Sequence, residues 1–168
     1  MIKANLFLVV ALLILFGCQR ETESVYELTD ITYMQNNEWF NCQGCFSIGQ
    51  INLHSGFVIR DENTYRMYED SMKIYPISDP PVDCDTATLV SINFNEYTLL
   101  GMATSHGACD TLTGKIWKDE VNNKIVYDID IKEYTGGCVL ILYMPLNLVL
   151  IPKIPDDYFV EFTVTRHQ

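Results

Sequence analysis

The closely spaced pair Cys42 and Cys45 is the motif of this chain with the most direct capacity for chemistry. A redox Cys-x-x-Cys pair activates its first thiol at the N-terminus of a helix, within a thioredoxin-like βαβ unit. Here the residues that follow, 46–53, have the pattern of a strand and not of a helix. We therefore interpret Cys42 and Cys45 as a structural disulfide that closes a small loop, or as free thiols. An envelope thiol-redox protein is the less favoured alternative.

The other cysteines do not extend this pair into a metal site. Zinc needs four ligands, which usually come as two close pairs, and Cys84, Cys109 and Cys138 form no second pair. The sequence therefore predicts no metal site, and we expect no cofactor. Cys109 and Cys138 flank the clearest hairpin of the chain, which makes them candidates for a cross-strand disulfide.

His106 precedes Cys109 by three residues, a spacing that raises the question of a Cys–His nucleophile. Such a pair needs the imidazole within hydrogen-bond reach of the thiol and a third group that orients the ring. Nearness in sequence supplies neither condition. A polar turn that contains a disulfide cysteine accounts for the stretch.

Carboxylates gather at two places without forming a recognised site. Asp79, Asp83 and Asp85 could offer oxygens to calcium, but the spacing and the glycine of an EF-hand are absent, which favours a solvated acidic loop. Asp128 and Asp130 share one face of an expected strand and are explained as its polar side. No phosphate-binding glycine loop, HExxH or GxSxG occurs. We therefore assign no catalytic residue and expect the chain not to be an enzyme.

Residues 1–17 have the organisation of a secretory signal peptide. Lys3 precedes an apolar run over residues 6–16, and this run of about 11 residues is shorter than the roughly 20 that a spanning helix needs. The stretch Leu15-Phe16-Gly17-Cys18 resembles a bacterial lipobox. The resemblance implies that Cys18 carries a lipid through its sulfur and becomes the mature N-terminus.

Residues 18–24 are expected to form a lipid-anchored tether. The run Gln19-Arg20-Glu21-Thr22-Glu23 resembles the acidic export signal of Bacteroidota surface lipoproteins, and an ordinary solvated tether explains it equally well. Several acyl chains anchor stably, because each buried methylene contributes about 0.8 kcal/mol. The sequence therefore predicts an outer-membrane lipoprotein of the cell envelope, and surface exposure stays open.

Composition limits what the rest of the chain can bind. The net charge of −11 argues against a nucleic-acid partner, whose phosphates require clusters of lysine and arginine. It also argues against adsorption to anionic lipid head groups. Removing residues 1–17 leaves about 150 residues, which suits a single β-rich globular domain over 25–168.

The hydrophobic pattern predicts one helix and many strands. The helix is expected over residues 62–74, with Asp61 as its N-cap, and Tyr65 and Tyr68 on it need an apolar partner surface. Strands are expected over residues 25–33, 46–53, 56–60, 89–94, 97–104, 112–118, 124–132, 139–143, 147–151 and 158–166. The expected fold class is α+β, mostly β, with one antiparallel, curved or partly closed sheet and a packed helix at about 62–74.

From Gly56 onward the chain contains the stretches "GFVIRDENTYRMYED", "INFNEYTLLG", "HGACD", "KIVYDIDIKE", "LVLIPK" and "VEFTV". Their order resembles the C-terminal domain of PrcB-type lipoproteins, the accessory subunits of a spirochaete surface protease complex. It is also similar to Bacteroidota-type lipoproteins. The resemblance implies a small β-rich module that binds or stabilises a partner, and it implies no catalytic residues. Residues 25–55 and the extra cysteines depart from that pattern.

These observations favour an outer-membrane-anchored, non-enzymatic module that binds a protein partner, such as a protease-complex accessory or inhibitor. The alternative is a small-ligand-binding, β-barrel-like lipoprotein, in which a curved sheet closes over a pocket of tyrosine and phenylalanine side chains.

Overall fold

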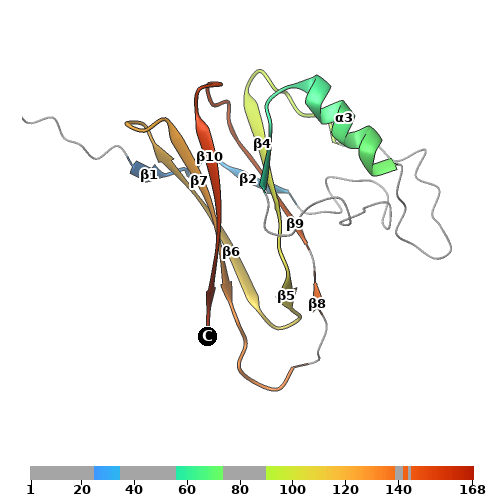
Figure 1. Ribbon diagram of the computed structural model, residues 1–168, viewed down its shortest axis with the longest axis vertical. Helices are drawn as coiled ribbons and strands as arrows, with labels where there is room; N and C mark the ends of the chain where they lie inside the picture. Colours follow the sequence, from blue (N-terminus) through green and yellow to red (C-terminus); the bar gives the residue numbers. More distant parts are fainter. Residues whose placement is uncertain (1–24, 35–55, 74–89, 139–141, 144) are drawn as a thin grey trace, which may run out of the picture.

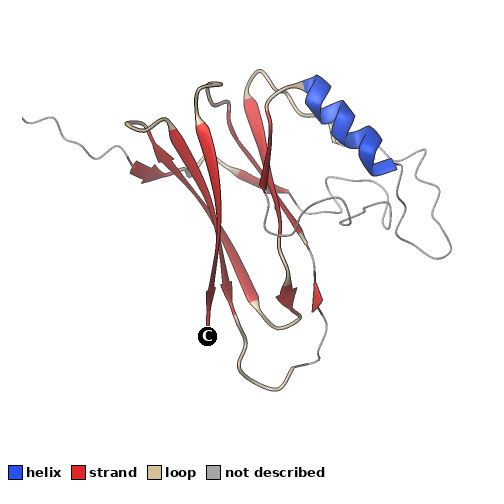
Figure 2. Ribbon diagram, viewed as in Figure 1, coloured by secondary structure: helices blue, strands red, loops and turns tan. Residues whose placement is uncertain are grey.

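The structure is a computed structural model that describes residues 25–34, 56–73, 90–138, 142–143 and 145–168. These residues form two four-stranded sheets and one helix, with a further pair of very short strands. The two sheets and the helix are stacked as three layers (Figure 1). Strands dominate the described residues, which confirms the predicted α+β, mostly β class (Figure 2).

The outer sheet has the strand order β1-β6-β7-β10. Its strands are β1 (Val25–Glu27), β6 (Thr111–Asp119), β7 (Lys124–Lys132) and β10 (Phe159–His167). β6 and β7 form the expected hairpin. The Asp119 carboxylate closes its turn by accepting the backbone N–H groups of Val121 and Asn122, each at 3.1 Å. Asn123 completes the turn in the left-handed region, at φ 49°, which asparagine tolerates better than most residues.

The central sheet has the order β2-β9-β4-β3. Its strands are β2 (Thr32–Met34), β9 (Leu146–Pro152), β4 (Tyr97–Ala103) and β3 (Gly56–Ile59). One of its faces packs against the outer sheet and the other against the helix. The strands β4 and β9 are therefore apolar on both faces, which explains why their sequences lack alternation.

The main core lies between the two sheets. β7 alternates strictly, and it places Ile125, Tyr127, Ile129 and Ile131 inward against Leu100, Met102, Val149 and Ile151 of the central sheet. β10 contributes Val160, Phe162 and Val164 in the same way. The predicted period of two in both strands is confirmed, and the polar residues between these positions form the outer face of the outer sheet.

The helix α3 (Glu62–Lys73) covers the other face of the central sheet (Figure 1). Its predicted N-cap is confirmed, because the backbone N–H of Thr64 donates to the Asp61 carboxylate at 2.9 Å. Tyr65 is buried in a second core that lies beneath the helix, and Tyr68 packs against that core. This surface is the partner that the sequence required for the two tyrosines.

The expected single sheet is replaced by two, and the first expected strand shows why. Residues 25–33 form no continuous strand: β1 pairs with β6 in the outer sheet, and β2 pairs with β9 in the central sheet. Between them Leu28 and Ile31 pack into the main core. The segment thus crosses from one layer to the other, as strands at the corner of a sandwich do.

The strand expected over residues 89–94 is also wrong for its described part, 90–94. These residues are irregular and lead into a turn, in which the backbone N–H groups of Glu96 and Tyr97 both donate to the Asn93 carbonyl at 3.0 Å. Ile92 and Phe94 alternate because both are buried in the core beneath α3, not because they pair with a neighbouring strand. The strands expected over 46–53 and over 139–141 lie outside the described residues.

One strand pair is parallel, although an antiparallel sheet was expected. β10 runs parallel to β7 along their full length, from Phe159 beside Lys124 to His167 beside Lys132. The chain leaves β9 at the end of the sandwich where β7 begins and enters the outer sheet there (Figure 1). β10 must therefore run in the same direction as β7. All other strand pairs in the described residues are antiparallel.

Candidate functional site

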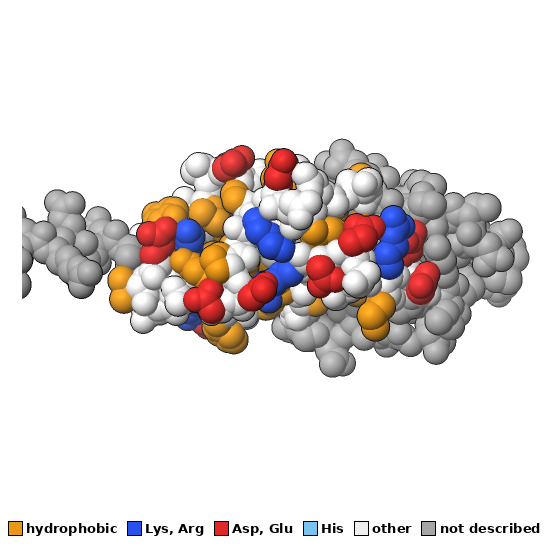
Figure 3. All heavy atoms as spheres, turned by 90° about the horizontal axis from the view of Figure 1, so that it is seen from above, with side chains coloured by type: hydrophobic (Ala, Val, Ile, Leu, Met, Phe, Trp, Pro, Cys, Tyr) orange, Lys and Arg blue, Asp and Glu red, His pale blue; other side chains and the backbone are white. Residues whose placement is uncertain are grey.

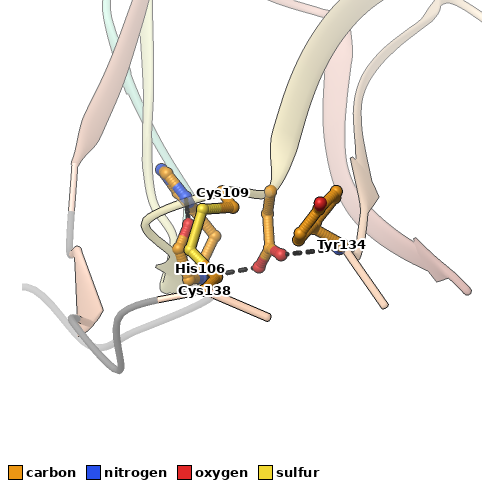
Figure 4. The surroundings of a disulfide bond; sticks show 6 residues. His106, Cys109, Tyr134 and Cys138 are labelled. Atoms are coloured by element: carbon orange, nitrogen blue, oxygen red, sulfur yellow. Dashed lines mark hydrogen bonds between the residues drawn. A yellow bond between two sulfur atoms is a disulfide. The ribbon is translucent and has the colours of Figure 1, made fainter. Parts of the chain in front are cut away.

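The predicted disulfide between Cys109 and Cys138 is present, at the open end of the β6–β7 hairpin (Figure 4). The Cα atoms of the two residues lie 6.3 Å apart, across 29 residues of sequence. Beside them the strands β5 (His106–Gly107) and β8 (Leu142–Tyr143) form a short antiparallel pair. The bridge therefore fastens the loops at this end of the sandwich.

Asp110 reinforces this loop through backbone hydrogen bonds. Its carboxylate accepts the N–H of Gly107 at 2.6 Å and the N–H of Tyr134 at 2.9 Å. These bonds, that of Tyr134 first, lower the pKa of Asp110, and the charges of His106 and Arg166 act in the same direction. Asp110 is therefore a structural clamp that joins the loop before β6 to the loop after β7.

His106 and Cys109 do not form the Cys–His nucleophile that their spacing suggested. Cys109 is held in the disulfide and carries no thiol. The His106 Nδ1 atom lies 2.8 Å from the backbone oxygen of Gly107. The stretch is thus a polar loop with a disulfide cysteine, as the sequence suggested.

The outer face of the outer sheet holds the carboxylates Asp128 and Asp130. The Asp128 carboxylate accepts the Thr163 hydroxyl from β10 at 2.6 Å, and Asp130 pairs with the His167 ring at 3.1 Å. Both carboxylates thus serve cross-strand contacts on a polar strand face, as predicted. This half of the face is polar and holds a hollow of about 250 Å³, lined by Thr113, Lys115, Asp128, Asp130, Thr165 and His167.

The other half of the same face carries an apolar group that we call the outer-sheet patch, formed by Val25, Trp117, Val126 and Phe159. Trp117 and Val126 are directly opposite each other on β6 and β7. Val25 on β1 and Phe159 on β10 lie diagonally to either side of this pair, by the register of the four strands. Val25 is 58% exposed and Phe159 64%. Side chains at such positions are neighbours on one sheet face.

Two lysines beside the patch are each paired with a carboxylate. Lys124 forms an ion pair with Glu161, and Lys115 lies 3.5 Å from Glu27. The Lys115 ammonium also lies over the Trp117 ring, 5.7 Å from its centroid. A partner surface could therefore cover the patch without separating either lysine from its carboxylate. Asp119, which is opposite Val25 on the same face, is satisfied by the hydrogen bonds of the turn. Figure 3 looks onto the end of the sandwich where β10 begins and shows hydrophobic side chains among acidic and basic ones there.

Sequence reasoning did not single out these four residues. Each strand on its own shows only alternation, and the patch exists because the register places Trp117 beside Val126. One signal was available: Phe159 and Trp117 occupy positions on the polar side of their strands, where a large apolar residue is unusual.

The remaining predicted site residues have no described position. Cys18, the expected lipid attachment point, and the pair Cys42 and Cys45 lie outside the described residues, as does the acidic loop over 79–85. In the part of the chain that is described, no three histidine, cysteine or acidic side chains are grouped closely enough to hold a metal ion. No helix among the described residues has both the length and the apolar character needed to cross a membrane.

The predicted likeness to PrcB-type lipoproteins stays a prediction that rests on the sequence stretches alone. Comparison of the chain with protein-family models, with curated proteins and with solved structures finds no match.

Proposed function

We propose that this chain is a lipid-anchored protein of the bacterial outer membrane whose β-sandwich binds a protein partner without catalysing a reaction. The observation that carries the proposal is the outer-sheet patch. It exposes two large apolar side chains, Val25 and Phe159, on a sheet face that is otherwise polar. Apolar groups centred on an aromatic residue and surrounded by charged groups are typical of protein-binding surfaces.

The pairing of the surrounding charges supports a protein partner. Burying an unpaired charge costs several kcal/mol, whereas a charge that keeps its partner at the edge of an interface costs little. Lys124 keeps Glu161, and Lys115 keeps Glu27. The expected partner surface is a flat, apolar area of a protein with polar groups at its edge.

The position of the patch relative to Cys18 suggests where the partner is met. β1 begins at Val25, seven residues after Cys18. Seven residues span at most about 25 Å, since a fully extended chain covers roughly 3.5 Å per residue. A lipid on Cys18 would therefore hold the patch close to the membrane surface. We expect the partner to be an envelope protein whose contact surface lies near that membrane, such as an accessory-dependent or inhibited protease.

Site-specific photo-cross-linking in the native bacterium tests this proposal. A benzophenone amino acid would be placed at Phe159, inside the patch, and in a second strain at Thr165. Thr165 lies on the same face of the same strand, in the polar half. We expect a discrete protein adduct at position 159, none at 165, and loss of the adduct when Trp117→Ala is added.

Two results would overturn the proposal. The first is the absence of any protein adduct at position 159. The second is an adduct that forms equally at 159 and 165, or that persists unchanged with Trp117→Ala, because such an adduct would report proximity and not recognition by the patch.

A further inference from the structure

A cavity of about 450 Å³ opens at the edge of the sandwich, where β2 and β9 of the central sheet lie beside β6 and β7 of the outer sheet. Most of its lining is apolar. The apolar lining residues are Met34, Leu112, Pro145, Leu146 and Leu148, of which Met34, Leu146 and Leu148 belong to the core beneath α3. Its size falls within the range of small-molecule sites, which are mostly apolar hollows with few polar groups.

The cavity wall contains two tyrosines that meet at a glycine. Gly114 lies on the inward face of β6, between Leu112 and Ile116, whose side chains pack into the core. Gly114 itself has no side chain to place there. A Cβ atom on Gly114 would lie 3.1 Å from the Tyr33 ring and 3.3 Å from the Tyr127 ring. The missing side chain thus lets both rings lie against the backbone of β6.

The Tyr127 hydroxyl is the unusual group in this wall. Tyr127 is 1% exposed, and no hydrogen bond joins its hydroxyl to any other described residue. Burial raises the pKa of Tyr127, and the nearby Tyr33 adds to the rise, so the hydroxyl stays protonated at neutral pH. The Tyr127 oxygen is not among the side-chain atoms that are sealed from solvent without a partner, so it is accessible at the wall of the cavity that Tyr127 lines. There the hydroxyl can donate to an oxygen of a bound molecule.

The cavity wall also contains two hydrogen-bond acceptors, one on Tyr33 and one on Asn147. The Tyr33 hydroxyl donates to the Gly114 carbonyl at 2.6 Å, which leaves its oxygen able to accept. Asn147 uses its amide nitrogen on the Met102 carbonyl and the Thr104 hydroxyl, which leaves its side-chain oxygen as a second acceptor. None of the described lining residues is charged. The described part of the lining therefore offers no charge that would compensate an ionised ligand.

We propose that this cavity binds a neutral, largely apolar small molecule that carries a carbonyl or hydroxyl oxygen, and that the Tyr127 hydroxyl donates to that oxygen. An ionised fatty acid does not fit, because no cation is found among the described lining residues. Burial first, and then the nearby Glu27 carboxylate, raise the pKa of Tyr33, so this wall also disfavours negative charge. This site is separate from the outer-sheet patch, which faces away from the core.

The test uses 6-propionyl-2-(dimethylamino)naphthalene, a neutral fluorescent ketone whose emission moves to shorter wavelength in apolar surroundings. The protein is the mature chain, residues 18–168, with Cys18→Ser, which keeps every described residue. We expect saturable binding with the blue-shifted emission. Tyr127→Phe should weaken binding about threefold to tenfold, the value of one hydrogen bond. Tyr68→Phe, a substitution at a tyrosine beneath α3 on the other side of the central sheet, should leave binding unchanged.

A second pair of variants checks the location. Leu112→Trp fills the cavity and should abolish binding. Val58→Trp enlarges a partly buried residue between the same two sheets, but on β3, at the opposite edge of the central sheet from β2, and should leave binding intact. Circular dichroism and the unfolding midpoint establish that each variant is folded. Failure of the parent protein, which carries only Cys18→Ser, to bind the ketone would overturn the proposal. Equal affinity in the Tyr127→Phe and Tyr68→Phe variants would also overturn it.

Discussion

The hydroxyl of Tyr33 donates a 2.6 Å hydrogen bond to the carbonyl oxygen of Gly114, 81 residues away in sequence. Tyr33 belongs to the central sheet and Gly114 to the outer sheet, so this bond joins the two layers directly. It lies at the edge of the sandwich where the cavity opens. The contact links the stability of the fold to the geometry of the proposed ligand site.

Tyr33→Phe should lower the free energy of unfolding by about 0.5–1.5 kcal/mol, because it removes this bond and little apolar contact. Tyr127→Phe removes a hydroxyl that bonds to no other described residue, so it should leave the ligand-free protein equally or more stable. Urea unfolding of both variants measures the difference. The reverse order of stability would contradict the assignment of the two hydroxyls.

Gly101 on β4 allows the ring of Phe57 to lie against the sheet beneath α3. A Cβ atom at Gly101 would overlap that ring, which also packs on Tyr68 with ring centroids 4.8 Å apart. Gly101→Ala should therefore destabilise the protein by about 1–3 kcal/mol. Gly137→Ala is the matched control, since nothing lies within 4 Å of its added methyl group, and its effect should stay within about 0.5 kcal/mol. Equal unfolding midpoints for the two variants would show that Phe57 moves aside without cost.

The disulfide should contribute measurably to stability by limiting the unfolded chain. For a separation of 29 residues, loop-closure entropy predicts about 3–4 kcal/mol. The double variant Cys109→Ser, Cys138→Ser should lose that amount in urea unfolding at neutral pH. A loss below about 1 kcal/mol would indicate that the β6–β7 hairpin and the Asp110 bonds already hold the loops together in the unbridged chain.

Local signals in the sequence predicted the elements whose formation depends on spacing alone. The alternation in β7 and β10 and the N-cap at Asp61 all lie where the sequence placed them. Ile92 and Phe94 show the limit of this reasoning. Alternate burial beneath a helix produces the same pattern as a strand, and only tertiary contacts separate the two.

The outer-sheet patch and the cavity depend on register and layering, which the sequence of one strand does not encode. Trp117 meets Val126 only because β6 and β7 are joined by a turn that fixes their pairing, and a slip of one residue would place them on opposite faces. The meeting of Tyr33 with Tyr127 further requires that residues 28–31 cross between the sheets. The alternative of a pocket of tyrosine and phenylalanine side chains stays a prediction, since the described lining of the cavity contains two tyrosines and no phenylalanine.

Acid should weaken the fold through Asp110. Its pKa is lowered from 3.8 by the bonds from Tyr134 and Gly107. A carboxyl whose pKa is lower in the folded state stabilises the fold above its unfolded pKa, and this stabilisation is lost as the pH falls through the folded pKa. The contribution should therefore be complete at neutral pH and disappear below about pH 4.

Asp110→Asn tests this contribution. The variant should be less stable than the unsubstituted protein at pH 7 and should lose less stability between pH 5 and pH 2. Asp61 and Asp119 also have lowered pKa values, through hydrogen bonds from Thr64 and Asn122 respectively, so the variant should keep part of the acid sensitivity. Urea unfolding across this pH range gives both slopes. Parallel pH profiles would mean that Asp110 is not a source of the acid sensitivity.

The proposed placement of the protein at the membrane depends on lipid attachment at Cys18. If residues 15–18 act as a lipobox, Cys18→Ser removes the only thiol at the attachment position, and the protein should leave the membrane fraction and incorporate no labelled fatty acid. The double variant Cys109→Ser, Cys138→Ser keeps that position and should remain labelled and membrane-bound. Metabolic labelling followed by membrane fractionation measures both properties. Labelling that survives Cys18→Ser would remove the reason for placing the outer-sheet patch near the membrane, because the seven-residue distance to Val25 would then have no fixed starting point.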